Sequence, residues 1–183
     1  ADREELYRWI EYYKIKFKSR VYTPLNNSEK YTLVLMGRAD FGLLGSYNKY
    51  KQTPFETFHV GGDGMTGSYT YATETIGLRG YDNGALTPYS DGRAYTRFSM
   101  ELHFPFLLQP SSTIYGLAFV EGGNAWTSLE NFNPFSLKRS AGVGVRIFLP
   151  MIGLMGIDWA YGFDKVQGEK GGGHFHFILG QEF

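Results

Sequence analysis

Cysteine is absent from the 183 residues. Its absence excludes a disulfide scaffold, a thiol nucleophile and a thiolate metal site. An excess of charge is missing as well, because 18 lysines and arginines balance 18 aspartates and glutamates. A nucleic-acid-binding protein usually carries a clear basic excess. We therefore predict no nucleic-acid partner.

Long apolar runs are also missing. The segment Leu33–Met36 is typical of the longest runs, whereas a membrane-spanning helix needs about 18 consecutive apolar residues or more. The first residues are acidic and polar, with no charged n-region and no apolar h-region. We expect a signal peptide to be absent or already removed. Two classes remain: a soluble β-protein, and a membrane barrel whose strands are apolar only at alternate positions.

Aromatic residues and glycine are abundant, at 17% of the chain and 24 residues respectively. Aromatic and β-branched side chains suit the pleated surface of a sheet, and glycine suits turns and bulges. The composition therefore indicates an all-β fold.

Alternation of apolar and polar residues predicts the strands. In Arg93–Phe106 the even positions are largely apolar and the odd positions largely polar, which gives one apolar face. Segment Thr113–Trp126 alternates poorly and is predicted from its Val, Tyr, Phe and Trp content. The predicted strands are Tyr13–Val21, Tyr31–Gly42, Arg93–Phe106, Thr113–Trp126, Ser140–Leu149, Ile152–Phe163 and Gly173–Phe183.

Most of these strands reach ten residues, whereas soluble strands usually have about 5–6 and a tilted membrane strand needs about 9–11. Short connections alternate with longer ones, and one loop covers about residues 46–92. Tight turns on one side and long loops on the other are typical of outer-membrane barrels. In a soluble lipocalin-like barrel the apolar face would point inward, and periodicity alone does not separate the two. Strand length and loop asymmetry favour an antiparallel transmembrane β-barrel.

Several motifs, in the right order, resemble the BamA family of outer-membrane protein assembly factors. Within the long loop, Phe58–Gly62 and Ile76–Tyr81 are similar to that family's loop signature, whose centre reads V-R-G-(F/Y). Phe119–Trp126 is similar to its F-V-D-x-G-x-x-W strand. Leu78 stands where the family has valine, and Glu121 where it has aspartate. The segments of the last three strands also follow the family in order: Ser140–Pro150, Ile157–Tyr161 and Phe175–Phe183.

The resemblance implies a non-enzymatic factor of the bacterial outer membrane that folds and inserts other barrels through a lateral gate. Family members have periplasmic POTRA domains followed by a sixteen-stranded barrel. The seven predicted strands correspond to the tenth through the sixteenth, so residues 1–183 are expected to be the C-terminal part of one barrel domain. The implied partners are the lipid bilayer, nascent barrel clients, accessory lipoproteins, and the remaining strands and POTRA domains upstream.

The resemblance also implies site residues. The loop motif is Leu78, Arg79, Gly80 and Tyr81, and its arginine is expected to reach into the lumen and pair with Glu101, Glu121 or both. The last strand is expected to form one side of the gate and to carry the C-terminal insertion signal. Its residues are Phe175, Phe177, Leu179, Gly180 and Phe183, with Gly180 at a position where the strand can bend.

Chemistry other than strand pairing finds little support. His174 and His176 have a spacing that suits zinc, but no third ligand is near in sequence, so we expect lumen-facing histidines and no metal. The glycine-rich segment 61–67 lacks a P-loop lysine. No Ser/His/Asp arrangement stands out, and we predict no catalytic residue and no cofactor. Three alternatives stay open: a small self-contained barrel acting as channel or adhesin, a related polypeptide-translocating barrel, and a soluble ligand-binding or hydrolytic barrel.

Overall fold

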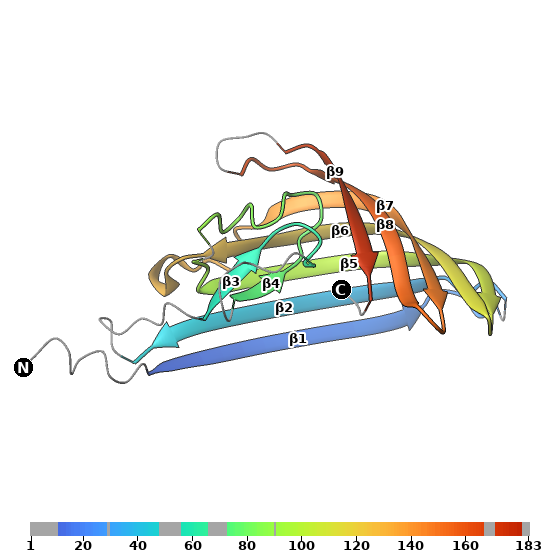
Figure 1. The fold of residues 1–183 in the computed structure, drawn as a ribbon, viewed down its shortest axis with the longest axis horizontal. Coiled ribbons are helices and arrows are strands. Elements are labelled where there is room, and N and C mark those ends of the chain that lie inside the picture. The colour runs from blue at the N-terminus through green and yellow to red at the C-terminus, as the bar shows by residue number, and fades with distance from the viewer. Residues whose placement is uncertain are drawn as a thin grey trace, which may run out of the picture.

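A single antiparallel sheet of seven strands forms most of the computed structural model (Figure 1). The structure describes residues 11–28, 30–47, 56–65, 73–89, 91–166 and 171–180. The sheet order is β1–β2–β5–β6–β7–β8–β9. The strands of the sheet are β1 (Tyr12–Pro24), β2 (Val34–Ser46), β5 (Ala94–Gln109), β6 (Ser112–Trp126), β7 (Lys138–Leu149), β8 (Gly153–Gly162) and β9 (Gly173–Leu179).

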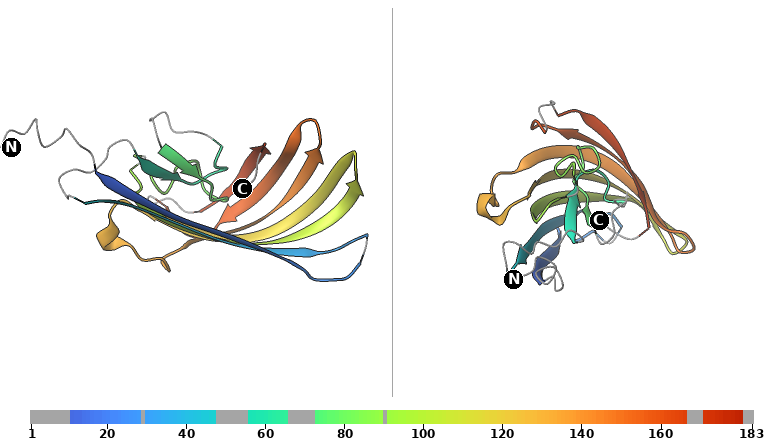
Figure 2. Two further views of the ribbon diagram at one scale, coloured as in Figure 1. Left: turned by 90° about the horizontal axis from the view of Figure 1, so that it is seen from below. Right: turned by 60° about the vertical axis from the view of Figure 1, so that its left-hand side comes forward.

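The described strands form an arc in which β1 and β9 do not pair with each other. Figure 2 shows the long loop between β2 and β5 lying on the concave side of this arc. β1 pairs only with β2, and β9 pairs only with β8, among the described strands. The predicted fold class is confirmed as an all-β antiparallel sheet, and each of its two outer strands has one edge without a described partner.

The alternation seen in the sequence separates the two faces of the sheet. The convex face carries large apolar side chains that lie open, such as Phe17 at 56% exposure, Val143 at 55% and Phe177 at 59%. The concave face buries charged side chains instead: Arg38, Asp40, Arg97, Glu101, Glu121, Arg146 and Asp158. An apolar outside around a polar inside is the arrangement of a membrane barrel and the reverse of a soluble one.

Strand bounds differ from the prediction at several ends. β2 begins and ends later than predicted, and β5 continues to Gln109 past a register shift between Pro105 and Leu107. Such an irregularity bends a strand without ending it. Because it interrupts the alternation of apolar and polar residues, the alternation predicted that the strand ends there. The last strand ends at Leu179, before Gly180, which has a φ of +86°. Phe183 lies outside the described residues.

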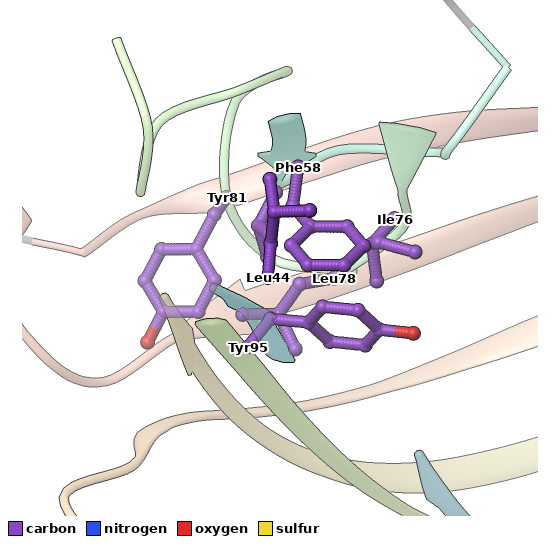
Figure 3. Packing of buried hydrophobic residues seen from close by; sticks show 7 residues of the cluster. Leu44, Phe58, Ile76, Leu78, Tyr81 and Tyr95 are labelled. Carbon is purple, nitrogen blue, oxygen red and sulfur yellow. The ribbon is translucent and has the colours of Figure 1, made fainter. Parts of the chain in front are cut away.

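The long loop has structure that its lack of period did not predict. Two short strands, β3 (Thr57–Val60) and β4 (Thr73–Ile76), pair in parallel, and each is too short to show a sustained alternation. They help to form an apolar core between the loop and the sheet (Figure 3). This core consists of Leu44, Phe58, Val60, Ile76, Leu78, Tyr81 and Tyr95.

The described residues contain no helix that is long and apolar enough to cross a membrane. The short 3₁₀ helix η1 (Leu129–Asn131) follows β6.

The lysines of β1 point toward the long loop. Lys14 Nζ lies 2.8 Å from Glu56 Oε2, and Lys16 Nζ lies 3.0 Å from Glu74 Oε2. Burial alone would raise the pKa of Glu74, but hydrogen bonds from Lys16 and Lys14 lower it below its usual value. Phe17, between the lysines, points the other way and is exposed.

This orientation predicts a spin-label result. In the full-length protein in lipid, a label replacing Phe17 should be relaxed mainly by oxygen, and one replacing Lys16 mainly by a water-soluble nickel chelate. The reason is that a lysine facing mid-bilayer lipid costs about 2–4 kcal/mol. A pattern with the two relaxers exchanged would mean that the sheet is oriented inside out.

Candidate functional site

The long loop returns to the concave face through residues 76–81. The segment is held within the loop first: the Gly62 N–H donates to Leu78 O at 3.1 Å, and the Leu78 N–H donates to Gly62 O at 3.0 Å. Leu78 is fully buried in the apolar core. The sheet also binds the segment, because Arg97 Nη1 on β5 donates to Gly77 O at 2.6 Å. The residue that follows Leu78 is thereby aimed at the centre of the concave face.

Arg79 is buried, at 1% exposure, and all its donor groups point at carboxylates. Its Nε lies 3.0 Å from Glu121 Oε1, and its Nη1 lies 2.9 Å from Asp158 Oδ2. Its Nη2 bonds to both Glu101 and Glu121, and its backbone N–H donates to Glu121 Oε2 at 2.9 Å. The guanidinium carbon also lies 3.5 Å from the ring centroid of Phe119, a cation–π contact.

The three carboxylates come from three strands, since Glu101 is on β5, Glu121 on β6 and Asp158 on β8. Antiparallel pairing with side chains on alternating faces brings them to one place. Burial by itself would lower the pKa of Arg79, but the facing carboxylates of Glu121 and Glu101 raise it above its ordinary value, so the guanidinium stays charged. The sequence predicted two of these partners, and the structure adds Asp158.

A second group of contacts completes this cluster. Arg146 Nη1 and Nη2 lie 2.5 Å and 2.7 Å from the two oxygens of Asp158. His103 Nε2 lies 2.8 Å from Glu101 Oε2, and Ser99 Oγ lies 3.2 Å from Glu121 Oε1. An ionised carboxylate can only accept, so the histidine donates. We call the group formed by Arg79, Glu101, Glu121, Arg146 and Asp158 the arginine cluster.

Gly80 fills a gap that admits no side chain. Its φ is +89°, a conformation that favours glycine. A Cβ atom added there would lie 2.7 Å from the Cβ of Ser140 and 3.1 Å from the backbone nitrogen of Gly162. The loop therefore approaches β7 and β8 at backbone distance, and any other residue at this position would push it away.

Tyr81 fixes the far end of the motif. Its hydroxyl donates to Arg139 O at 2.6 Å, and the residue is 3% exposed. Burial raises the pKa of Tyr81 to about 12, so the phenol stays a neutral donor at physiological pH. The four motif residues thus have separate tasks: Leu78 packs, Arg79 pairs, Gly80 permits close approach and Tyr81 bonds to β7.

The terminal strand β9 carries the other predicted residues. Phe175, Phe177 and Leu179 lie on the convex face at 70%, 59% and 63% exposure. His176 and His174 lie on the concave face, where the Gly80 N–H donates to His176 Nε2 at 2.9 Å. Groups of three or more residues with metal-ligating side chains are absent from the described part of the chain. The loop motif and the terminal strand, which the sequence analysis treated as separate, are in contact.

The contacts that sequence reasoning missed involve Asp158, His176 and the backbone of Gly77. The contacts of Asp158 and His176 depend on register across strands that are far apart in the chain, such as the separation of 96 positions between Gly80 and His176, and the Gly77 contact depends on how the loop folds back on the sheet. Which inward residues are neighbours could not be read from periodicity, because alternation fixes the face of a side chain but not its position along the partner strand.

Known proteins provide an independent comparison. The model of the Omp85 superfamily domain matches residues 4–183. The solved structure of BamA from Haemophilus ducreyi lacking POTRA domains 1–3 is similar, with a TM-score of 0.64 and 20% sequence identity. The match covers 92% of this chain but only 34% of the other, so this chain spans about a third of that one. The fold is that of a C-terminal portion of a BamA-type outer-membrane barrel, and the chain belongs to the Omp85 superfamily.

Proposed function

We propose that residues 1–183 form the C-terminal part of the barrel domain of an outer-membrane assembly factor, which folds and inserts other outer-membrane barrels. The observation that carries the proposal is the set of contacts that β9 makes. This strand pairs with β8 on one side, and its concave face touches the loop motif. In this assignment, Phe175, Phe177, Leu179, Gly180 and Phe183 belong to the gate and signal strand.

The physical basis is backbone pairing. Lipid offers no hydrogen-bond partners, so every N–H and C=O group of a spanning strand must be paired within the protein. An incoming strand that pairs with the edge of β9 satisfies its own backbone groups as it enters the bilayer. Such templating lowers the cost of insertion and needs no nucleotide, cofactor or catalytic residue.

The proposed setting is the bacterial outer membrane, in contact with its lipid bilayer. The proposed partners are nascent barrel clients, accessory lipoproteins, and the strands and POTRA domains upstream in the same polypeptide. The motif of Leu78, Arg79, Gly80 and Tyr81, with its partners Glu101 and Glu121, is assigned the role of holding the loop inside the barrel.

A hydrolase screen should find no activity that disappears when a single acidic residue is replaced.

Reconstitution tests the proposal. The full-length protein in liposomes of outer-membrane lipid should accelerate the appearance of folded, heat-modifiable client barrel over empty liposomes. The matched control is the same protein with proline replacing Phe177, because proline removes a backbone donor and disrupts a strand. An unfolded client that inserts no faster with the wild-type protein than with empty liposomes would contradict the function.

A further inference from the structure

The terminal strand β9 is held from two directions. Its ladder with β8 runs from the pair Tyr161 and Gly173 to the pair Met155 and Leu179. The second support is the long loop, which contacts its concave face. The loop therefore restrains β9 from the concave side.

Two histidines at alternate positions of β9 bind the loop through their side chains, and the backbone N–H of Leu179 also donates to Met65 Sδ at 3.3 Å. The Gly80 N–H donates to His176 Nε2 at 2.9 Å, and Asp82 Oδ1 lies 3.2 Å from His174 Nδ1. The two imidazole rings are stacked, with centroids 6.2 Å apart and planes inclined by 27°. His176 is 5% exposed. A lumen-facing pair of histidines therefore binds the loop directly after the buried arginine.

The chemistry of the first contact assigns the state of His176. A ring nitrogen that accepts a hydrogen bond from a backbone N–H must keep its lone pair, so Nε2 is unprotonated and the ring is neutral with its proton on Nδ1. Glutamine also presents an acceptor at the end of a side chain of similar length. It can therefore replace this contact, whereas alanine cannot.

The second step is the link to the arginine cluster. Gly80 follows Arg79 directly, and Arg79 is bonded to carboxylates on β5, β6 and β8. The hydrogen bond from Gly80 then ties the same stretch of backbone to β9. Two consecutive residues thus connect four strands, and a single peptide unit joins the contact with β9 to the arginine cluster. A continuous hydrogen-bonded path of this kind is a physical route for coupling.

We propose that His176, assisted by His174, is a positioning residue that couples the terminal strand to the arginine cluster. It holds the concave face of β9 against the loop, so that the edge of β9 away from β8 stays in place for a pairing strand. The partner at that edge is an unpaired β-strand of another polypeptide, an assignment that rests on the proposed function. Loop and terminal strand then open together, and neither is released alone.

Hydrogen–deuterium exchange on the full-length protein in lipid tests the coupling without any client. His176→Ala should speed exchange about tenfold in residues 76–82 and in residues 173–179 together. His176→Gln should restore both segments to within about threefold of the wild type. Phe177→Ala is the matched control, because it removes a large side chain from the convex face of the same strand. It should leave residues 76–82 unchanged.

The result that overturns the coupling is faster exchange in β9 alone after His176→Ala, or a glutamine variant as fast as the alanine variant. If His176→Ala does not assemble, Asp82→Ala gives a second reading, since its 81% exposed side chain contributes little to folding. That change should speed exchange of both segments by about threefold, and faster exchange of the loop alone would overturn the proposal. Client insertion is measured separately, so failure of the proposed function leaves this result interpretable.

Discussion

Arg79→Glu is expected to expel the long loop from the concave face and to destabilise the barrel more than any other single charge change in the motif. The substitution would place a fourth carboxylate beside Glu101, Glu121 and Asp158, which are at most 7% exposed. Breaking a buried ion pair by removing one partner costs about 3–5 kcal/mol, because the other charge is stranded. Like-charge repulsion adds to that cost.

Two further variants at Arg79 should destabilise the barrel to smaller extents. Arg79→Ala removes the guanidinium from Glu121, whereas Glu101 keeps the bond from His103 and Asp158 keeps Arg146, so its loss of stability should be smaller than that of Arg79→Glu. Arg79→Lys keeps the charge but offers one compact ammonium in place of a planar fork of donors. The stability of the Arg79→Lys variant should lie between that of Arg79→Ala and that of the wild type.

The measurement is the thermal midpoint of the heat-modifiable full-length protein, together with proteolysis of the loop. Arg139→Ala is the control, because its side chain is 70% exposed and its pair with Asp164 lies at the surface, where such pairs contribute about 0–1 kcal/mol. If Arg79→Glu kept the wild-type midpoint and a protected loop, the arginine cluster would have no stabilising role.

The second large effect concerns the chain on its own. Residues 1–183 expressed alone should not form a closed monomeric barrel in detergent. Seven antiparallel strands leave β1 and β9 running in the same direction, whereas bacterial single-chain barrels use even strand numbers of eight or more. The exposed edges of β1 and β9 would each leave a row of unpaired backbone groups, and each such group costs several kcal/mol in lipid.

Space inside the barrel gives a second reason. The loop between β2 and β5 fills the concave side with its own two-stranded sheet and an apolar core. An eight-stranded barrel has an interior only wide enough for side chains. Native mass spectrometry of the isolated chain should therefore show mixed assemblies, and cryo-electron microscopy should show open or partner-completed sheets. A monodisperse closed monomer would favour the small self-contained barrel instead.

The sequence was a good guide to what alternation controls. The faces of Arg97, Glu101 and Asp158 follow from a period of two, and so do the exposed apolar residues of the convex side. The ends of the strands were less accurate, because β5 passes through a register shift and β9 stops before a glycine with positive φ. These features are set by local backbone geometry that hydrophobic patterns do not encode.

The site was only partly predictable, for a different reason. The pairing of Arg79 with Glu101 and Glu121 was expected from the resemblance, and both carboxylates lie within hydrogen-bonding distance of the guanidinium. Asp158 and His176 also belong to the site, and they lie on β8 and β9 at the far end of the sheet. Their contribution depends on the curvature of the arc, which brings β8 and β9 round to the loop. Curvature results from twist and register over the whole sheet, so a short sequence motif does not predict it.

Disulfide trapping can show whether the edge of β9 that lies away from β8 receives the strand of a client. Residues 1–183 contain no cysteine, so after replacement of any upstream cysteine, single cysteines can be placed at successive positions of β9 in the full-length protein and in the last strand of an unfolded client. We expect register-specific cross-links along β9 during insertion, with few from cysteines on the convex face of β7. A client that inserts at the normal rate and never cross-links to β9 would contradict it.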